Sequence, residues 1–212
     1  MLVICPLSMA AIFAYVTAGL APGLDAGHPT EYLQITCVLW ALIMTVIPIL
    51  RLMRVVSLPL WFTILVYANM YLYVISLCQG MYMNIRWWGD LTHILSSLVV
   101  ASFVFIALCL MESHSPSLVT FGSERGLLCM LFLVSLSFGG IWEMMEGFTD
   151  AVAGQSFMVY GATDTLADLA ADLIGALVMV VIAGSILRKQ DAVSVASKIR
   201  LGRNAIDVDS ND

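Results

Sequence analysis

Acidic residues and one histidine recur at helical spacing in the second half of the chain. Asp90 and His93 are three residues apart, and so are Glu143 and Glu146. Side chains separated by three or four residues lie on the same face of a helix. A face that carries carboxylates and an imidazole can bind a divalent metal ion or transfer protons. A third set of acids repeats every four residues and has the same property: Asp164, Asp168 and Asp172.

The elements that must position these side chains are strongly apolar. Of the 212 residues, 61% are hydrophobic and 11% are charged, with a net charge of −6. Soluble domains carry about 25% charged residues, and a water-soluble fold cannot bury this much apolar side chain. The composition therefore excludes a soluble enzyme, a nucleic-acid-binding protein and a disordered chain. It indicates an all-α membrane protein.

Six apolar segments are long enough to cross a bilayer, which takes roughly 17–25 residues. We predict a polytopic transmembrane helical bundle with six spans: 2–21, 32–50, 55–79, 91–111, 126–147 and 164–187. The first segment is interpreted as a retained span, not a signal peptide, because no positive charge precedes it. Residues 1–187 are thus predicted to form the transmembrane domain, and residues 188–212 a polar cytoplasmic tail.

Basic residues are distributed unevenly between the two ends of these spans. All but one of the nine lie on the side that both termini share: Arg51, Arg54, Arg125, Arg188, Lys189, Lys198, Arg200 and Arg203. Only Arg86 lies on the other side. Because loops rich in Lys and Arg stay in the cytoplasm, both termini are predicted to be cytoplasmic. The expected location is the inner (cytoplasmic) membrane, as a multi-pass protein.

This orientation places every acidic set in the outer half of the membrane. Asp90 and His93 begin the fourth span, Glu143 and Glu146 end the fifth, and the third set begins the sixth. An ionised carboxylate near the bilayer interior costs on the order of 3 kcal/mol. Six acids with only Arg86 nearby therefore require protonation, a water-filled cavity or a neutralising cation.

A structural explanation competes with a functional one. Asp90 and Asp164 each stand where a helix is expected to begin, and both could be N-caps. The other four acids lie inside helical segments, so capping does not explain them. For these four acids and His93, a purely structural hydrogen-bond network is the alternative to a functional polar site.

Several other residues receive structural predictions. His28 is predicted to be a solvated residue of an outer loop, not a ligand. The five cysteines lie in apolar segments without a CxxC pair and are predicted to be small core residues. Tryptophans are expected to form an aromatic belt at the outer interface: Trp87, Trp88 and Trp142. Glycines are expected to let helices approach closely: Gly139, Gly140, Gly175 and Gly184.

The order of the motifs resembles that of YjdF-like proteins, bacterial and archaeal inner-membrane proteins of unknown function that are grouped with VanZ-like proteins. The resemblance covers roughly residues 87–187 and rests on three motifs: Asp90-x-x-His93, Ile141-Trp-Glu143-x-x-Glu146 and Asp164-x-x-x-Asp168-Leu-x-x-Asp172-x-x-Gly175-Ala. Asp172 departs from the family pattern, where Asn is more common, and adds a charge. The resemblance implies a membrane protein with a polar site and implies no particular reaction.

The first functional hypothesis is a metal-dependent hydrolase or transferase that acts on a lipid-linked substrate in the outer leaflet. Either Asp164 or Asp172 would then be the general base toward a metal-bound water. The imidazole suits Zn, Mn or Fe, and the carboxylates also suit Mg. Five residues would hold the metal ion: Asp90, His93, Glu143, Glu146 and Asp168.

The second hypothesis is a small carrier, coupled to protons or cations, that uses the same acids as a relay. A carrier needs access from both faces, yet the cytoplasmic halves of the spans lack matching polar residues. This asymmetry favours an outward-facing site over a pathway. A structural or assembly subunit of a membrane complex is a third hypothesis.

Overall fold

The computed structural model describes residues 4–53, 56–58, 60–114, 121–156, 158–159, 161 and 163–201. Some predictions fall on other residues and lie outside this description. These are the start of the first span at residues 2–3, the start of the third at residue 55, the basic residues Arg54 and Arg203, and the tail after residue 201.

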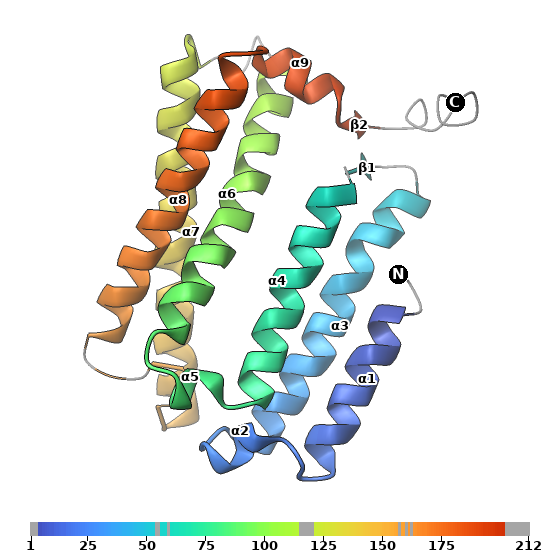
Figure 1. Ribbon diagram of the computed structural model, residues 1–212, viewed down its shortest axis with the longest axis vertical. Coiled ribbons are helices and arrows are strands. Elements are labelled where there is room, and N and C mark those ends of the chain that lie inside the picture. Colours follow the sequence, from blue (N-terminus) through green and yellow to red (C-terminus); the bar gives the residue numbers. More distant parts are fainter. Residues whose placement is uncertain are drawn as a thin grey trace. The chain divides into compact units, whose positions relative to one another are not determined.

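Each predicted span overlaps one of the six longest helices in the described part of the chain (Figure 1). The six helices are α1 (Ile4–Thr17), α3 (Thr30–Leu52), α4 (Leu60–Cys78), α6 (Trp88–His114), α7 (Glu124–Ala153) and α8 (Asp164–Leu187). Four of them, α3, α6, α7 and α8, are long and apolar enough to cross a membrane, whereas α1 and α4 are shorter apolar helices. The prediction of an all-helical membrane protein is therefore confirmed. The number of spans and the side on which the termini lie stay predictions.

The described residues also form five short elements. Three are helices: α2 (Pro22–Asp25), α5 (Met81–Asn84) and α9 (Ala192–Ser197). Two are strands, β1 (Val56–Ser57) and β2 (Arg200–Leu201), which pair in antiparallel orientation with Val56 opposite Leu201. Part of the predicted polar tail thus has regular structure, since it contains α9 and β2.

The chain divides into two compact units. The first consists of the described residues up to Trp88 together with those from Ile199 onward, and the second is Gly89–Lys198. In the second unit, apolar side chains of α6, α7, α8 and α9 form a core that includes Phe105, Leu131, Met179 and Ala196. All of the acidic sets also lie in this second unit, outside its apolar core.

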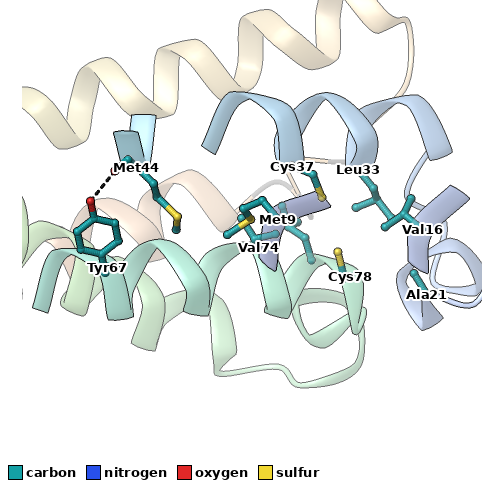
Figure 2. Close-up of a cluster of buried hydrophobic side chains, with 10 residues drawn as sticks. Met9, Val16, Ala21, Leu33, Cys37, Met44, Tyr67, Val74 and Cys78 are labelled. Carbon is teal, nitrogen blue, oxygen red and sulfur yellow. Dashed lines mark hydrogen bonds between the residues drawn. The ribbon is translucent and has the colours of Figure 1, made fainter. Parts of the chain in front are cut away.

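The core of the first unit is formed by α1, α3 and α4 (Figure 2). Pro48 lies inside α3 and has no N–H, so the carbonyl of Met44, four residues earlier, lacks its usual helical donor. The hydroxyl of Tyr67 on α4 donates a hydrogen bond to this carbonyl. Tyr67 therefore satisfies the backbone acceptor that Pro48 leaves open, which matters most where water is absent.

The segment that precedes α3 differs from its prediction. His28 is only 3% exposed, so the prediction of a solvated loop residue is wrong. The reason is close packing of α2 on the end of α4, where a Cβ on Gly23 would lie 2.2 Å from the carbonyl oxygen of Leu77. The His28 ring lies 6.0 Å from the ring of Tyr32. Burial lowers the pKa of His28, which favours the neutral imidazole.

The pairing of Tyr67 with Pro48 predicts a coupled effect on stability. Tyr67→Phe should destabilise the protein by about 1–3 kcal/mol, because it leaves the buried carbonyl of Met44 without a donor. In a Pro48→Ala background the helix supplies its own N–H, so the same substitution should cost clearly less. Denaturation of all four proteins in detergent measures this coupling. Equal costs in the two backgrounds would contradict this role of Tyr67.

Candidate functional site

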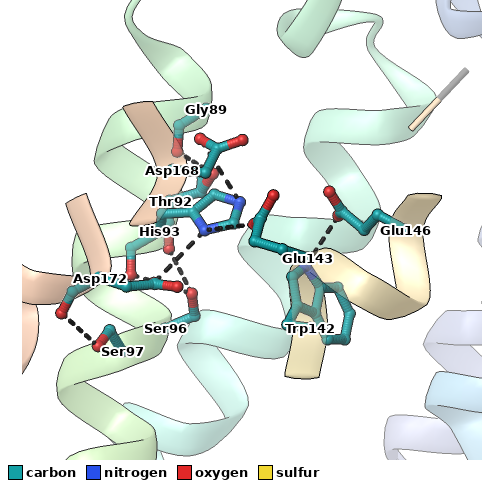
Figure 3. A network of polar contacts seen from close by, with 10 residues as sticks. All are labelled: Gly89, Thr92, His93, Ser96, Ser97, Trp142, Glu143, Glu146, Asp168 and Asp172. Carbon is teal, nitrogen blue, oxygen red and sulfur yellow. Dashed lines mark hydrogen bonds and ion pairs between the residues drawn. The ribbon is translucent and has the colours of Figure 1, made fainter. Parts of the chain in front are cut away.

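Three helices of the second unit bring the predicted residues to one end (Figure 3). Because consecutive helices alternate in direction, the start of α6, the end of α7 and the start of α8 meet there. His93, Glu143, Glu146 and Asp168 each offer one ligand atom, and these atoms all lie within 4.8 Å of one another. The convergence expected from the spacing is thus present for these four residues.

The imidazole of His93 lies between carboxylates of two other helices (Figure 3). Its Nδ1 is 3.4 Å from Oδ1 of Asp172 and 3.9 Å from Oε1 of Glu143. Its Nε2 is 3.7 Å from Oδ1 of Asp168. Both nitrogens therefore face acids, and the ring is the point where α6, α7 and α8 meet.

Glu143 is the least satisfied member of the group. Its side chain is 4% exposed, and neither carboxylate oxygen has a hydrogen-bond partner in the described part of the chain. Only His93, through the 3.9 Å contact, lies at ion-pair distance among the described residues. A buried carboxylate without hydrogen bonds is costly. The arrangement is what a site for a positively charged ligand would present.

Glu146 is held by a neighbour on its own helix. The indole Nε1 of Trp142 donates a 2.8 Å hydrogen bond to Oε1 of Glu146, one helical turn away. The aromatic-belt prediction for Trp142 therefore missed its main contact. The signal was available in the sequence, because residues four apart on a helix are neighbours.

Asp172 lies behind the imidazole and outside the group of four. It is 4% exposed, and its backbone carbonyl accepts a 2.9 Å hydrogen bond from the hydroxyl of Ser97 on α6. Its side chain reaches His93 on one side and the backbone of Gly139 on the other. A carboxylate held in this way can fix the orientation of the histidine.

Asp90 and Asp164 occupy different positions from those predicted. Asp90 is exposed in the first turn of α6, and Asp164 is the half-buried first residue of α8. The N-cap predictions are wrong, because α6 already begins at Trp88 and the N-cap of α8 is Thr163. An acid in the first turn is still favoured by the helix dipole. Both residues interact electrostatically with Asp168, but neither belongs to the group of four.

Asp150 is a buried acid that the sequence reasoning missed. It lies four residues after Glu146 and thus on the same face of α7. Its carboxylate accepts hydrogen bonds from the backbone N–H of Met158, at 3.1 Å, and of Val159, at 2.9 Å. Asp150 therefore ties the connection after α7 to the end of that helix, and its charge is satisfied by backbone donors.

Two glycines allow the helices to come this close. A Cβ on Gly175 would lie 2.6 Å from the carbonyl oxygen of Ile94, and one on Gly139 would lie 2.3 Å from Oδ2 of Asp172. The prediction of close approach is confirmed at both. Gly140 has open space within 4 Å, and Gly184 is only in ordinary contact at 3.4 Å.

The chain belongs to the DUF2238 family of predicted membrane proteins, whose model matches residues 6–190. The match covers most of α1 and the whole of the other five long helices, and therefore the acidic site. The function of this family is unknown. No curated protein and no solved structure matches the chain.

The two adjacent glycines of α7 predict opposite effects of the same substitution. Gly139→Ala should destabilise the protein by about 1–3 kcal/mol, because its new methyl group collides with Asp172. Gly140→Ala meets no atom and should be neutral or stabilising by up to about 1 kcal/mol, since alanine favours helix. Thermal unfolding in detergent separates the two. Equal melting temperatures would show that α7 and α8 are not packed this closely.

Proposed function

We propose that this membrane protein binds a divalent metal ion through His93, Glu143, Glu146 and Asp168, and uses it in hydrolysis or group transfer on a lipid-linked substrate. The observation that carries the proposal is the state of Glu143, which is buried with both oxygens lacking hydrogen-bond partners among the described residues and faces three other potential ligands. A divalent cation would neutralise these carboxylates where water cannot.

The dimensions of the group support this assignment. Two ligands of one metal at about 2.0–2.2 Å lie roughly 3–4.2 Å apart. With Nε2 of His93 as the ligand atom, its 3.7 Å distance to Oδ1 of Asp168 falls in this range. The widest separation, 4.8 Å, requires only a small contraction. One imidazole with three carboxylates favours Zn, Mn or Fe over Mg.

The packing of the second unit supports a one-sided site in preference to a pathway. Beyond the group of four, the interior of α6, α7 and α8 is filled by the apolar core that contains Phe105, Leu131 and Met179. Among the described residues, the buried polar groups at this depth are the hydroxyls of Ser102 and Ser135, which donate to carbonyls of their own helices, and no carboxylate, imidazole or amine is buried with them. A proton or cation relay across the membrane would need such ionisable groups there. An enzyme that acts on one face does not.

The surroundings of the group support a substrate that arrives from the lipid phase. Ile141, Met144 and Phe148 are 62%, 76% and 70% exposed, and they alternate along α7 with the buried acids. Leu166 on α8 is 71% exposed close to Asp168. In a membrane these apolar side chains face hydrocarbon, so a lipid-linked molecule could approach the acids without crossing water.

The two remaining acids take different roles in this proposal. A bound metal would supply a Lewis acid and lower the pKa of a coordinated water. Asp164, half-buried one turn before Asp168, is the proposed general base. Asp172 is better placed as a positioning residue, since it contacts Nδ1 of His93 and leaves Nε2 directed at Asp168. Such carboxylate–histidine pairs orient metal ligands.

The number of spans, the side of the membrane on which the termini lie and the identity of the membrane are part of the same proposal. Six spans with both termini in the cytoplasm of a cell with an inner membrane would put the acidic group in the outer half of the bilayer. The uneven distribution of Lys and Arg supports this orientation. The relation to YjdF-like and VanZ-like proteins also stays a prediction.

Cysteine labelling tests the orientation. In a cysteine-free background, a cysteine at the exposed position Ser156, after α7, should react with an impermeant reagent added outside intact cells. A cysteine at the exposed position Ser194, in α9, should react only after the membrane is permeabilised. The reverse pattern would place the acidic group on the cytoplasmic side.

Metal content tests the central assignment. Protein purified with divalent metals present should hold about one ion per chain, measured by elemental analysis. Glu143→Gln should lower the metal content at least tenfold, because it removes a ligand charge whose oxygens accept no hydrogen bond among the described residues. The metal-free variant should melt at or above the wild-type temperature, since a buried uncompensated charge is gone. Glu124→Gln, an exposed acid at the far end of the same helix, is the matched control.

Two outcomes would refute a metal site. One is a metal content below about 0.1 ion per chain in the wild-type protein under metal-replete conditions, where a functional site should be filled. The other is normal metal content in both glutamine variants. If Glu143→Gln instead unfolds in the absence of metal while Glu124→Gln does not, the acidic group is architectural.

Substitution of Asp172 should affect metal binding less than substitution of Glu143, and in a different way. Asp172→Asn should keep the metal but lower its affinity about 10–100-fold, as loss of an outer carboxylate typically does. Chelator competition measures the affinity, and the absorption spectrum of the Co²⁺-substituted protein reports the changed histidine geometry. A purely structural role would lower the melting temperature of the metal-free protein and leave both of these readouts unchanged.

A further inference from the structure

A groove at the other end of α8 carries a second and independent inference. It lies where α8 ends and the chain turns back into α9, and its volume is about 490 Å³. Cavities of roughly 300–1,000 Å³ are the usual size for small-molecule sites. The groove belongs entirely to the second unit, and none of the proposed metal ligands lines it.

One wall of the groove is apolar and belongs to a membrane-crossing helix. Val181, Ile182 and Ile186 line it from the last turns of α8. Val181 is 69% exposed and Ile182 is 42% exposed. Since α8 is long and apolar enough to cross a bilayer, these exposed side chains would face the hydrocarbon region when it does so. The apolar wall is therefore continuous with the lipid phase.

The rim of the groove is polar and positively charged. Lys189 and Lys198 both line it, and Nζ of Lys198 donates a hydrogen bond to Oε1 of Gln190. None of the described lining residues is acidic. The nearby carboxylate of Asp191 accepts a 2.8 Å hydrogen bond from the backbone N–H of Ser194 at the start of α9. The two ammonium groups thus lack a carboxylate within the groove itself.

The position along α8 matches a membrane interface. A helix rises 1.5 Å per residue, so Asp168 and Lys189 are about 30 Å apart along the axis. The hydrocarbon core of a bilayer is also about 30 Å thick. When the acidic group lies near one interface, the lysines lie near the opposite one, where lipid phosphates are found.

We propose that this groove binds an anionic phospholipid. The phosphate would lie between Lys189 and Lys198, and the first part of an acyl chain would follow Val181 and Ile182. Basic pockets beside transmembrane helices recognise lipid head groups by this combination of charge and apolar surface. A free phosphate ion would use the lysines but leave the apolar wall unexplained, so the proposed ligand is the lipid.

The test measures lipid binding to the full-length protein in detergent by native mass spectrometry. Phosphatidylglycerol should bind clearly more tightly than phosphatidylcholine, and inorganic phosphate should not displace it. The double variant K189Q/K198Q should bind phosphatidylglycerol at least tenfold more weakly, since each basic residue near an anionic lipid contributes about fivefold. Arg188→Gln removes the same charge beside the groove, outside its lining, and should have little effect.

A second variant distinguishes loss of lipid binding from loss of the fold. Ile182→Trp keeps both lysines and fills the apolar wall, so it should also weaken phosphatidylglycerol binding while the thermal unfolding curve stays that of a folded protein. Equal loss in Arg188→Gln would indicate general charge attraction and overturn the proposal. Displacement by inorganic phosphate, or normal binding in Ile182→Trp, would equally overturn it.

Discussion

The cost of a buried carboxylate controls the arrangement of the second unit. Five such groups are buried on α7 and α8, and four of them have a visible partner. Asp150 accepts backbone N–H groups, Glu146 accepts the indole of Trp142, and Asp168 and Asp172 face the imidazole of His93. Glu143 is the exception, because in the described part of the chain its oxygens accept no hydrogen bond of normal geometry and its ion-pair contact is with a histidine that two other acids share. A cation in the group would resolve this imbalance, and the metal proposal follows from it.

Burial is also costly for a backbone carbonyl without a hydrogen-bond donor. The cost of burying polar groups likewise separates polar and apolar regions along the helices of the second unit. In the first unit, the Tyr67 hydroxyl donates a hydrogen bond to the Met44 carbonyl, which lacks a helical donor because Pro48 has no N–H. In the second, polar groups gather at one end of the helices, while the apolar core around Phe105 fills the interior beyond them. A site closed on one side in this way fits chemistry at a single membrane face. The lysine groove at the far end of α8 is consistent with an interface at the other face.

Helix positions could be predicted well because their cause is local. Apolar length alone located all six long helices, and the bounds of α8 agree with the predicted segment 164–187. The i,i+3 and i,i+4 spacings predicted the shared faces of the acids for the same reason. Contacts that depend on how the helices pack against one another could not be predicted. Spacing treats Gly139 and Gly140 alike, yet only Gly139 meets Asp172. Likewise, His28 became buried because α2 packs on α4, a contact between segments distant in sequence.

Anomalous X-ray diffraction from crystals of metal-loaded protein would show whether the four side chains bind a metal ion. Data collected on both sides of the absorption edge of the bound metal would locate it without any assumption about activity. We expect one strong peak about 2.0–2.3 Å from ligand atoms of His93, Glu143, Glu146 and Asp168. Asp172 should stay at hydrogen-bond distance from the histidine and outside the coordination shell. A map with no peak there, and with ordered water on the Glu143 carboxylate instead, would refute the metal site.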